Sequence, residues 1–361
     1  MRGEPVAVAT IGRPEAVPVT PVPRAVPATT GSVIAFAPPP GAASANETAA
    51  PAVDIENGVT VVRSATGGGP MILKMPQPPP EATARGLATA PDPRLVEPSA
   101  SGPLPKIGPD GARPDHAYAH GPMPLDGRPG IAILIGGMGL DRRTTADAGT
   151  LLPDAVSFGF APYGDDLAGQ VLKARQAGHE VILQAPMEGF GPAAEATLSH
   201  MLLAEGGNDN RLRWLMGRFT GYAGLGNYLG ARLLADDNAL RPILKDVASR
   251  GLFFVDDGTA QRSVASSLAA ELRLPFVRAD VVLDAKADAA AMAAAFARLE
   301  TLARERGVAV GSATGHPETV AALSRFLAEA GKHGVVLVPV SQAASLDQTS
   351  PLAGRASAAP H

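Results

Sequence analysis

Apolar and polar positions alternate regularly along the chain from Ile131 onward. Short apolar runs rich in Val, Ile and Leu are followed by stretches whose apolar residues recur three and four positions apart. This is the pattern of buried strands alternating with amphipathic helices. The predicted strands are Ile131–Ile135, Val156–Ala161, Glu180–Leu183, Tyr222–Leu225, Leu252–Val255, Phe276–Val277 with Val281–Leu283, Val308–Val310 and Val335–Val338. The predicted helices are Asp141–Leu152, Asp165–Ala177, Asn208–Phe219, Asp236–Arg250, Arg262–Leu272, Asp288–Arg306 and Pro317–Lys332.

The ends of these helices carry the expected signals. Aspartates precede four of them and supply side-chain acceptors for the first backbone N–H groups, at Asp141, Asp165, Asp236 and Asp288. Glycines follow four of them where a left-handed residue is favoured, at Gly178, Gly251, Gly307 and Gly334. Strand and helix in strict alternation predict an α/β fold, a single parallel (β/α) barrel of seven to eight strands with its helices outside.

The region before the first strand has a different composition. Of the 35 prolines, 25 lie before residue 131, and no helical or strand period is sustained there. Such a segment buries too little apolar surface to offset the entropy of ordering its backbone. We therefore expect residues 1–127 to be a disordered Pro/Ala/Gly-rich linker, 128–343 the barrel and 344–361 a disordered tail. Ser32–Phe36 and Val59–Val62 are β-prone but short, and Lys106–Ala119 has turn signals typical of a segment packed on the domain.

Composition excludes several classes of function. The net charge of −4 and the pI near 6.0 give no basic surface for nucleic acid. The absence of cysteine excludes disulfides, thiolate metal ligands and cysteine nucleophiles. No apolar run reaches 18 residues, and proline interrupts the N-terminus before a signal-type core, so we expect no membrane span and no signal peptide in this chain. His116 and His120 are interpreted as loop histidines, and His179 and His333 as structural residues at helix ends.

Polar residues gather where the predicted strands end, which is where β/α barrels place their functional groups. The groups are carboxylates, amides, phenols, a guanidinium and an imidazole, as a polar ligand such as a sugar requires. Asp256 and Asp257 are either functional residues or caps of the next helix, because both kinds of residue occupy this position in such folds. In the same way, Arg278 and Asp280 are either functional residues or a local ion pair. The GxSxG nucleophile motif is missing, and the Gly136–Gly139 sequence GGMG is interpreted as a tight turn.

The segment from Ile131 to Gln342 resembles the divergent polysaccharide deacetylases, which have the β/α barrel of glycoside hydrolases and carbohydrate deacetylases. The matching segments, in chain order, are IAILIGGMGL, FAPYGDDL, AGHEVILQAPME, GLGNYLGARLLAD, GLFFVDDGT, RADVVLDA, GHPET and GVVLVPVS. The resemblance implies a polysaccharide deacetylase-type hydrolase that acts on carbohydrate.

The resemblance also shows three departures at positions where the family usually carries metal ligands. Family members have IDDLG where this chain has Gly136 and Gly137, HLPME where it has Gln184, and NHMGSR where it has Tyr228 after Asn227. Glycine has no side-chain ligand, and glutamine and an un-ionised tyrosine are poor ligands for transition metals. We therefore expect this chain to supply no metal ligands. The residues that remain on matching positions are Glu188, Asn227, Arg232, Asp256, Asp280, Asp284 and His316.

From this resemblance we expect a carbohydrate-metabolism protein of the cell envelope that binds glycan or an envelope protein with little or no hydrolysis. The partner class is a polysaccharide or peptidoglycan-type glycan, and the expected location is the periplasm or envelope. The alternative is an active deacetylase with a rebuilt site that holds zinc or another divalent metal. The candidate catalytic residues are Asp256, Asp280 and His316. The candidate substrate-binding residues are Tyr163, Gln184, Glu188, Asn227, Tyr228, Arg232, Asp257, Arg278 and Asp284.

Overall fold

The structure is a computed structural model that describes residues 52–56, 59–63, 71–72, 86–191 and 198–349. Its contacts divide the chain into two units, residues 1–77 and 78–361. In the first unit, β1 (Ala52–Glu56), β2 (Val59–Arg63) and β3 (Met71–Ile72) form an antiparallel sheet in that order. The β-prone segment Val59–Val62 is thus part of a strand, although it was expected to form no element. Ser32–Phe36 lies outside the described residues.

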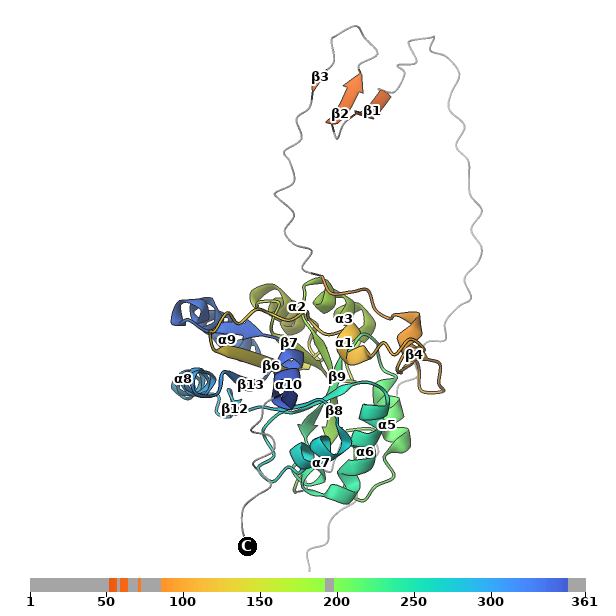
Figure 1. Cartoon of the computed structure of the whole chain (residues 1–361), viewed down its shortest axis with the longest axis vertical. Helices are drawn as coiled ribbons and strands as arrows, with labels where there is room; N and C mark the ends of the chain where they lie inside the picture. The colour runs from red at the N-terminus through yellow and green to blue at the C-terminus, as the bar shows by residue number, and fades with distance from the viewer. Residues whose placement is uncertain (1–51, 57–58, 64–70, 73–85, 192–197, 350–361) are drawn as a thin grey trace, which may run out of the picture. The chain divides into compact units, whose positions relative to one another are not determined.

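The second unit is a parallel β/α barrel, as the sequence predicts (Figure 1). Within the described residues its sheet has nine strands, in the order β11-β10-β9-β8-β7-β6-β13-β12, with β14 paired to β6. The strands are β6 (Gly130–Met138), β7 (Ser157–Phe160), β8 (Val181–Met187), β9 (Gly224–Leu229), β10 (Phe253–Asp256), β11 (Phe276–Arg278), β12 (Val281–Val282), β13 (Val308–Thr314) and β14 (Val336–Val338).

The two edges of this sheet are joined by one short segment. Only Ala279 and Asp280 separate β11 from β12. Ala279 N donates to Asp256 O at 2.9 Å, and Asp280 N donates to Val310 O at 2.7 Å. The segment therefore bonds first to β10 and then to β13, which closes the strand order into a ring.

Side chains of β6 show how the two faces of the sheet differ. Ile131, Ile133 and Ile135 pack in the outer core against the helices. Ala132 and Leu134 belong to the inner core, together with residues of β8, β10 and β13. Successive side chains of a strand point to opposite faces, so Gly136, two residues after Leu134, also faces inward. The inner face thus becomes small and polar toward the carboxyl ends of the strands.

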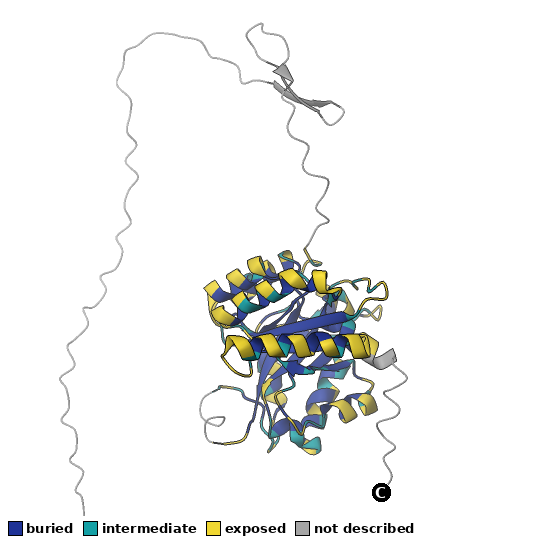
Figure 2. Ribbon diagram, turned by 90° about the vertical axis from the view of Figure 1, so that its left-hand side faces the viewer, coloured by how far each residue is buried: buried dark blue, intermediate teal, exposed yellow. Residues whose placement is uncertain are grey.

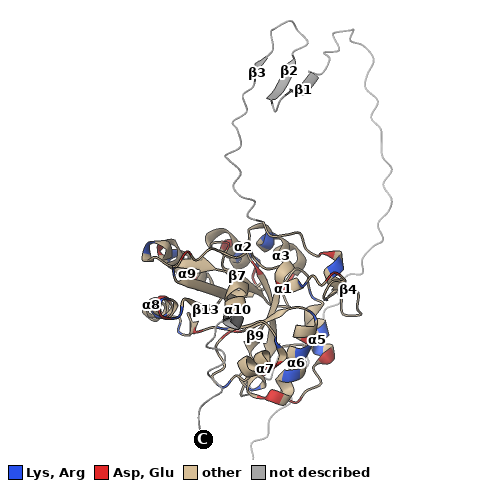
Figure 3. Cartoon of the chain, viewed as in Figure 1, with Lys and Arg blue, Asp and Glu red and all other residues tan. Residues whose placement is uncertain are grey.

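The helices lie around the sheet, and their outward faces are exposed while the strands are buried (Figure 2). They are α2 (Arg142–Leu151), α3 (Leu167–Gln176), α5 (Asp209–Met216), α6 (Asp237–Ser249), α7 (Ala265–Leu272), α8 (Ala289–Arg306) and α9 (Pro317–Ala330), with short 3₁₀ turns η2 (Leu233–Ala235) and η3 (Gly331–His333). The last helix, α10 (Val340–Thr349), instead packs on the inner core through Val340, Ala343 and Ala344. Charged side chains lie mainly on these helices and on loops (Figure 3). No helix of the described residues is long and apolar enough to cross a membrane.

Most of the predicted helix signals are confirmed. Asp141, Asp236 and Asp288 accept hydrogen bonds from the first backbone N–H groups of α2, α6 and α8. The prediction for α3 is wrong by one residue, because Asp166 caps it and Asp165 instead offers its carbonyl to Gln170 Nε2. Gly307 after α8 has φ +87, as its position requires.

Residues 86–127 differ from the expectation of a linker, because the structure folds them onto the barrel. This segment, the N-terminal strap, contains η1 (Pro93–Leu95), β4 (Val96–Glu97), β5 (Leu104–Pro105) and α1 (Pro114–Ala117). Leu95 and Tyr118 are buried in the inner core. Two of its prolines begin η1 and α1, and its prolines do not prevent burial of its few large apolar residues. At the other end α10 continues to Thr349, beyond the expected boundary at 343, and residues 350–361 lie outside the described residues.

Candidate functional site

Two glycines of β6 and the amide of Gln184 in β8 form a corner across the intervening strand β7. Gln184 Oε1 accepts a hydrogen bond from Gly137 N at 2.7 Å. A Cβ atom added to Gly136 would lie 2.5 Å from Gln184 Nε2, so the glutamine fills the space that a larger residue at 136 would need. Gly137 has φ +74, a conformation that other residues rarely adopt. Gln184 is 8% exposed, and among the described residues its Nε2 group donates to no acceptor.

Asp256 is the last residue of β10 and Asp257 follows it, so their side chains point to different faces. Asp256 is fully buried, and its Oδ1 accepts from Gly258 N while its Oδ2 lies 3.5 Å from Arg278 Nε. Arg278 also donates to Ala260 O. Val255 is paired with Gly226, which is paired in turn with Gln184, so Asp257 shares the inward face of Gln184. Asp257 is therefore the carboxyl group nearer to the barrel interior.

Burial raises the pKa of the Asp257 carboxyl above its ordinary value, and hydrogen bonds from Thr259 oppose that effect. Thr259 N and Thr259 Oγ1 donate to Asp257 Oδ1 at 2.9 Å and 2.6 Å. Asn227, at the end of β9, fixes the same turn because its Oδ1 accepts from Asp257 N. From the other side, Ser312 Oγ of β13 donates to Asp257 O at 2.6 Å. The Asp257 turn is thus held from both sides.

Glu188 and Arg232 form a structural connection between the loops after β8 and β9. The Arg232 guanidinium pairs with Glu188 Oε1, and Glu188 Oε2 accepts from Ala204 N at 2.7 Å. The Glu188 carbonyl accepts from Arg232 N and Leu233 N, both at 3.1 Å. The carboxylate is 7% exposed and engaged through both oxygens. This pair positions the two loops that border the site.

Three exposed apolar residues lie beside these loops, Phe190 after β8 and Tyr228 and Leu229 at the end of β9. Phe190, Tyr228 and Leu229 are 62%, 42% and 39% exposed. Leu229 has φ +61, a left-handed conformation that costs about 1 kcal/mol or more for a residue with a Cβ atom. Backbone strain of this kind concentrates at functional sites. The sequence analysis identified Tyr228 and missed Phe190, for which a loop position without periodicity gives no signal.

Tyr163 lies in a separate aromatic cluster after β7. Its hydroxyl donates to Ser199 O at 2.6 Å, and burial raises its pKa to about 12. Its ring lies 6.1 Å from that of Trp214, which stacks on His200 at 3.9 Å. Arg218 lies over the Trp214 ring at 4.8 Å. These contacts hold Tyr163 within the loop packing.

The three candidate catalytic residues do not come together. Asp256 faces Arg278, and Asp280 binds Arg306 at 2.7 Å and Val310 N at 2.9 Å, so the local pair of Arg278 with Asp280 is not formed. His316 is exposed at the start of α9. It lines a cavity between α8 and α9 together with Asp284, whose Oδ2 accepts from Thr314 N.

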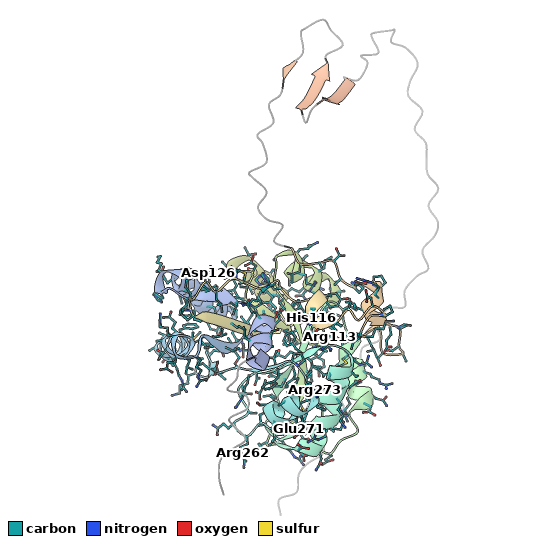
Figure 4. All side chains as sticks on the ribbon, in the orientation of Figure 1. Arg113, His116, Asp126, Arg262, Glu271 and Arg273 are labelled. Carbon is teal, nitrogen blue, oxygen red and sulfur yellow. The ribbon has the colours of Figure 1, made fainter. Side chains whose placement is uncertain are left out.

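The remaining histidines lie away from the strand-end corner. His116 is 78% exposed and lies near Arg113 on the strap (Figure 4). His120 N donates to Glu180 Oε2, and His179 and His333 contact Phe158 and Glu300. Within the described residues, no three His, Asp or Glu side chains form a group able to hold a metal ion.

The residues at the strand-end corner do not fit a transition metal. The only side chain of the Gly136, Gly137 and Gln184 corner is a neutral amide, and its oxygen is already hydrogen-bonded to Gly137 N. Tyr228 is a phenol, which binds such metals weakly unless ionised. The arrangement instead supplies an amide donor, a partly desolvated carboxyl group and an exposed aromatic ring.

Comparison with known proteins agrees with this fold. The family model for divergent polysaccharide deacetylases matches residues 133–344, more than half of the chain. The crystal structure of the uncharacterized protein ATU2773 from Agrobacterium tumefaciens C58 is 38% identical, with a TM-score of 0.64 and coverage of 66% of this chain and 98% of that one. The uncharacterized protein YibQ of Escherichia coli K12 is 24% identical over 180 residues, 49% of this chain and 56% of YibQ.

A protein from Haemophilus influenzae is 22% identical over 201 residues, which is 55% of this chain and 70% of that protein. This chain therefore spans little more than half the length of its Escherichia coli relative. The family match covers all the strands of the barrel from within β6 to β14, together with the first turn of α10. The chain belongs to the divergent polysaccharide deacetylase family.

Proposed function

We propose that this barrel binds acetylated polysaccharide in the cell envelope through its strand-end site and hydrolyses it little or not at all. The observation that carries the proposal is the hydrogen bond between Gln184 Oε1 and Gly137 N. It places a neutral, engaged amide at the corner where a deacetylase needs metal ligands. Removal of such ligands lowers metal affinity strongly. The family membership supports glycan as the ligand class.

The groups at the site match the chemistry of an N-acetyl sugar. The Gln184 Nε2 group is a donor suited to an acetyl carbonyl, and Asp257 offers a carboxyl group suited to a sugar hydroxyl or amide N–H. The exposed ring of Tyr228 offers a flat apolar surface for the C–H face of a pyranose ring. Amide, carboxyl and aromatic groups together are the usual components of sugar recognition by an open site.

The test compares binding and hydrolysis on the same protein. The full chain is titrated with a chitin tetrasaccharide and with its fully deacetylated form, by calorimetry, in the presence of a chelator. We expect binding of the acetylated form only, and no acetate release when zinc is added to a separate sample without chelator. Tyr228→Ala should weaken binding about tenfold, or about 1.4 kcal/mol, and Tyr228→Phe should keep most of the affinity because the ring remains.

Two results would contradict the proposal. Zinc-dependent release of acetate that is lost on chelation would establish an active deacetylase with a rebuilt site. Equal binding of the acetylated and deacetylated forms would exclude recognition of the acetyl group. For the location, the full chain with any in-frame upstream extension is fused to a reporter that is active only after export. We expect signal from this fusion, and absence of signal would argue against the envelope.

A further inference from the structure

A cavity of about 620 Å³ lies between α8 and α9, on the outside of the barrel. In Figure 1 the two helices lie apart on the same side of the sheet. α8 packs on β13 and β6, whereas α9 packs chiefly on α2, which leaves a groove between them. The groove is distinct from the strand-end site, because only the end of the groove at Asp284 and His316 reaches the carboxyl edge of the sheet.

The floor of the groove is apolar. Phe296 of α8 and Phe326 of α9 stack with ring centroids 4.2 Å apart, and Met292 lies beside them. The α8 wall consists of Ala289, Ala293 and Ala297, spaced four residues apart and exposed. Residues four apart share one face of a helix, and alanines on that face let another helix approach to the 8–10 Å typical of packed helices.

The groove is elongated. Both helices begin at the carboxyl edge of the sheet, and the lining runs along α8 from Ala289 to Glu300. Eleven steps at 1.5 Å per residue correspond to about 16 Å, or roughly three helical turns. A groove of that length between two helices suits a third helix better than a compact ligand.

The rim of the groove is acidic. Its lining includes five carboxylates and one guanidinium, with two histidines: Asp284, Asp288, Glu300, Glu318 and Glu329 against Arg325, with His316 and His333. Glu300 and Glu329 have partners in Arg304 and Lys332, whereas Asp284, Asp288 and Glu318 have no ion-pair partner among the described residues. An acidic rim around an apolar floor attracts and orients a partner with basic flanks.

We propose that the α8–α9 groove binds an amphipathic helix of a partner protein, with an apolar stripe and lysine or arginine on its flanks. The apolar stripe covers Phe296 and Phe326, and the basic residues face the acidic rim. This interaction uses the helical layer outside the barrel and is independent of glycan binding.

The test uses two fluorescent synthetic 18-residue peptides with leucine at helical spacing, one flanked by lysine and the other by glutamate. Binding to the full chain is measured by fluorescence anisotropy. We expect the lysine peptide to bind at least tenfold more tightly, and added salt to weaken it. Ala293→Gln with Ala297→Gln should weaken it at least tenfold, since glutamine keeps the helix and fills the groove.

The matched control is Ala294→Gln, a neighbouring exposed position outside the groove lining, which should leave binding unchanged. Arg325→Gln should tighten binding of the lysine peptide about threefold, and Glu318→Gln should weaken it by a similar factor. The proposal is overturned if neither peptide binds or if Ala294→Gln weakens binding as much as the double variant. Binding of palmitate without binding of either peptide would identify a small amphiphile as the occupant and would also overturn the proposal.

Discussion

At the residue scale, the side chain of Gln184 occupies the space next to Gly136. The glutamine amide occupies the volume that a Cβ atom at 136 would enter, and its oxygen satisfies the N–H group of Gly137. A larger residue at 136 forces the glutamine to turn and leaves that N–H group without its partner. The two positions are therefore coupled through sterics and one hydrogen bond, and neither is free to change alone.

A double-mutant cycle tests this coupling. Gly136→Ala should lower the free energy of unfolding by about 1–2 kcal/mol in the wild-type background, since it displaces the amide and breaks its hydrogen bond. In a Gln184→Ala background the same substitution should cost much less, because the displaced group is already gone. Urea unfolding of the four proteins measures the coupling, which we expect to exceed about 0.5 kcal/mol. Additive effects would show that the two residues act independently.

At the scale of single elements, the sequence predicted where strands and helices lie better than it predicted where strand-end side chains point. The pair Asp256 and Asp257 was visible after the predicted strand Leu252–Val255, but its orientation depends on which residue of β10 pairs with Gly226. A shift of one residue exchanges the faces of both carboxylates, and that register is fixed by tertiary pairing. The same limit applies to His316, whose loop position after β13 was predicted while its outward location was not.

The junction between α3 and β8 gives an element-scale prediction on pH. His179 is fully buried, stacks on Phe158, and has its Nδ1 atom 3.0 Å from Val156 O. Burial lowers its pKa below the ordinary 6.5. The unfolded chain therefore binds a proton more readily, so the contribution of His179 to stability is fully present above pH 6.5 and is lost as the pH falls from 6.5 toward the folded-state pKa.

His179→Gln should reduce this loss, because an amide can still donate to Val156 O but does not titrate. Urea unfolding at intervals between pH 7.5 and 5 should show wild-type stability falling by at most about 1.4 kcal/mol per pH unit from this group, with a flatter profile for the variant. His116→Gln makes the same change at an exposed position and should keep the wild-type profile. Parallel profiles for wild type and His179→Gln would contradict the assignment.

At the scale of the whole second unit, the N-terminal strap completes the end of the barrel opposite the candidate site. Arg175 Nη1 donates to Tyr118 O and Gly221 O, and its guanidinium lies 5.2 Å from the Tyr118 ring. His120 N donates to the buried Glu180, which also accepts from Ser157 Oγ and Ser341 N. Strap, barrel and α10 are thus held together through shared polar groups.

Composition alone did not reveal this role, because the strap is rich in proline and lacks any period. Its contribution rests on a few residues, Leu95 and Tyr118 above all, which are almost fully buried among inner-core side chains. Isolated large apolar residues within a proline-rich segment give no periodic signal, so burial of this kind is decided by the barrel end that they cover. The Lys106–Ala119 segment, with its turn signals and aromatic residue, was the one indication of packing.

Truncation tests the strap directly. A chain beginning at residue 86 should unfold at the same urea concentration as the full chain, because it keeps every strap contact described above. A chain beginning at residue 128 exposes the inner core, removes the Tyr118 O acceptor of Arg175 and leaves Glu180 without the N–H group of His120. Removal of a large core side chain lowers the free energy of unfolding by about 3–5 kcal/mol. The loss of both Leu95 and Tyr118 therefore approaches the whole stability of a typical domain. We therefore expect the chain that begins at residue 128 to aggregate or to bind a hydrophobic dye.

Point variants test the same contacts in the 86–361 chain. Tyr118→Ala should lower the urea midpoint clearly, and Tyr118→Phe should lower it less. Equal midpoints for the chains that begin at 86 and 128 would show that the barrel is complete without the strap.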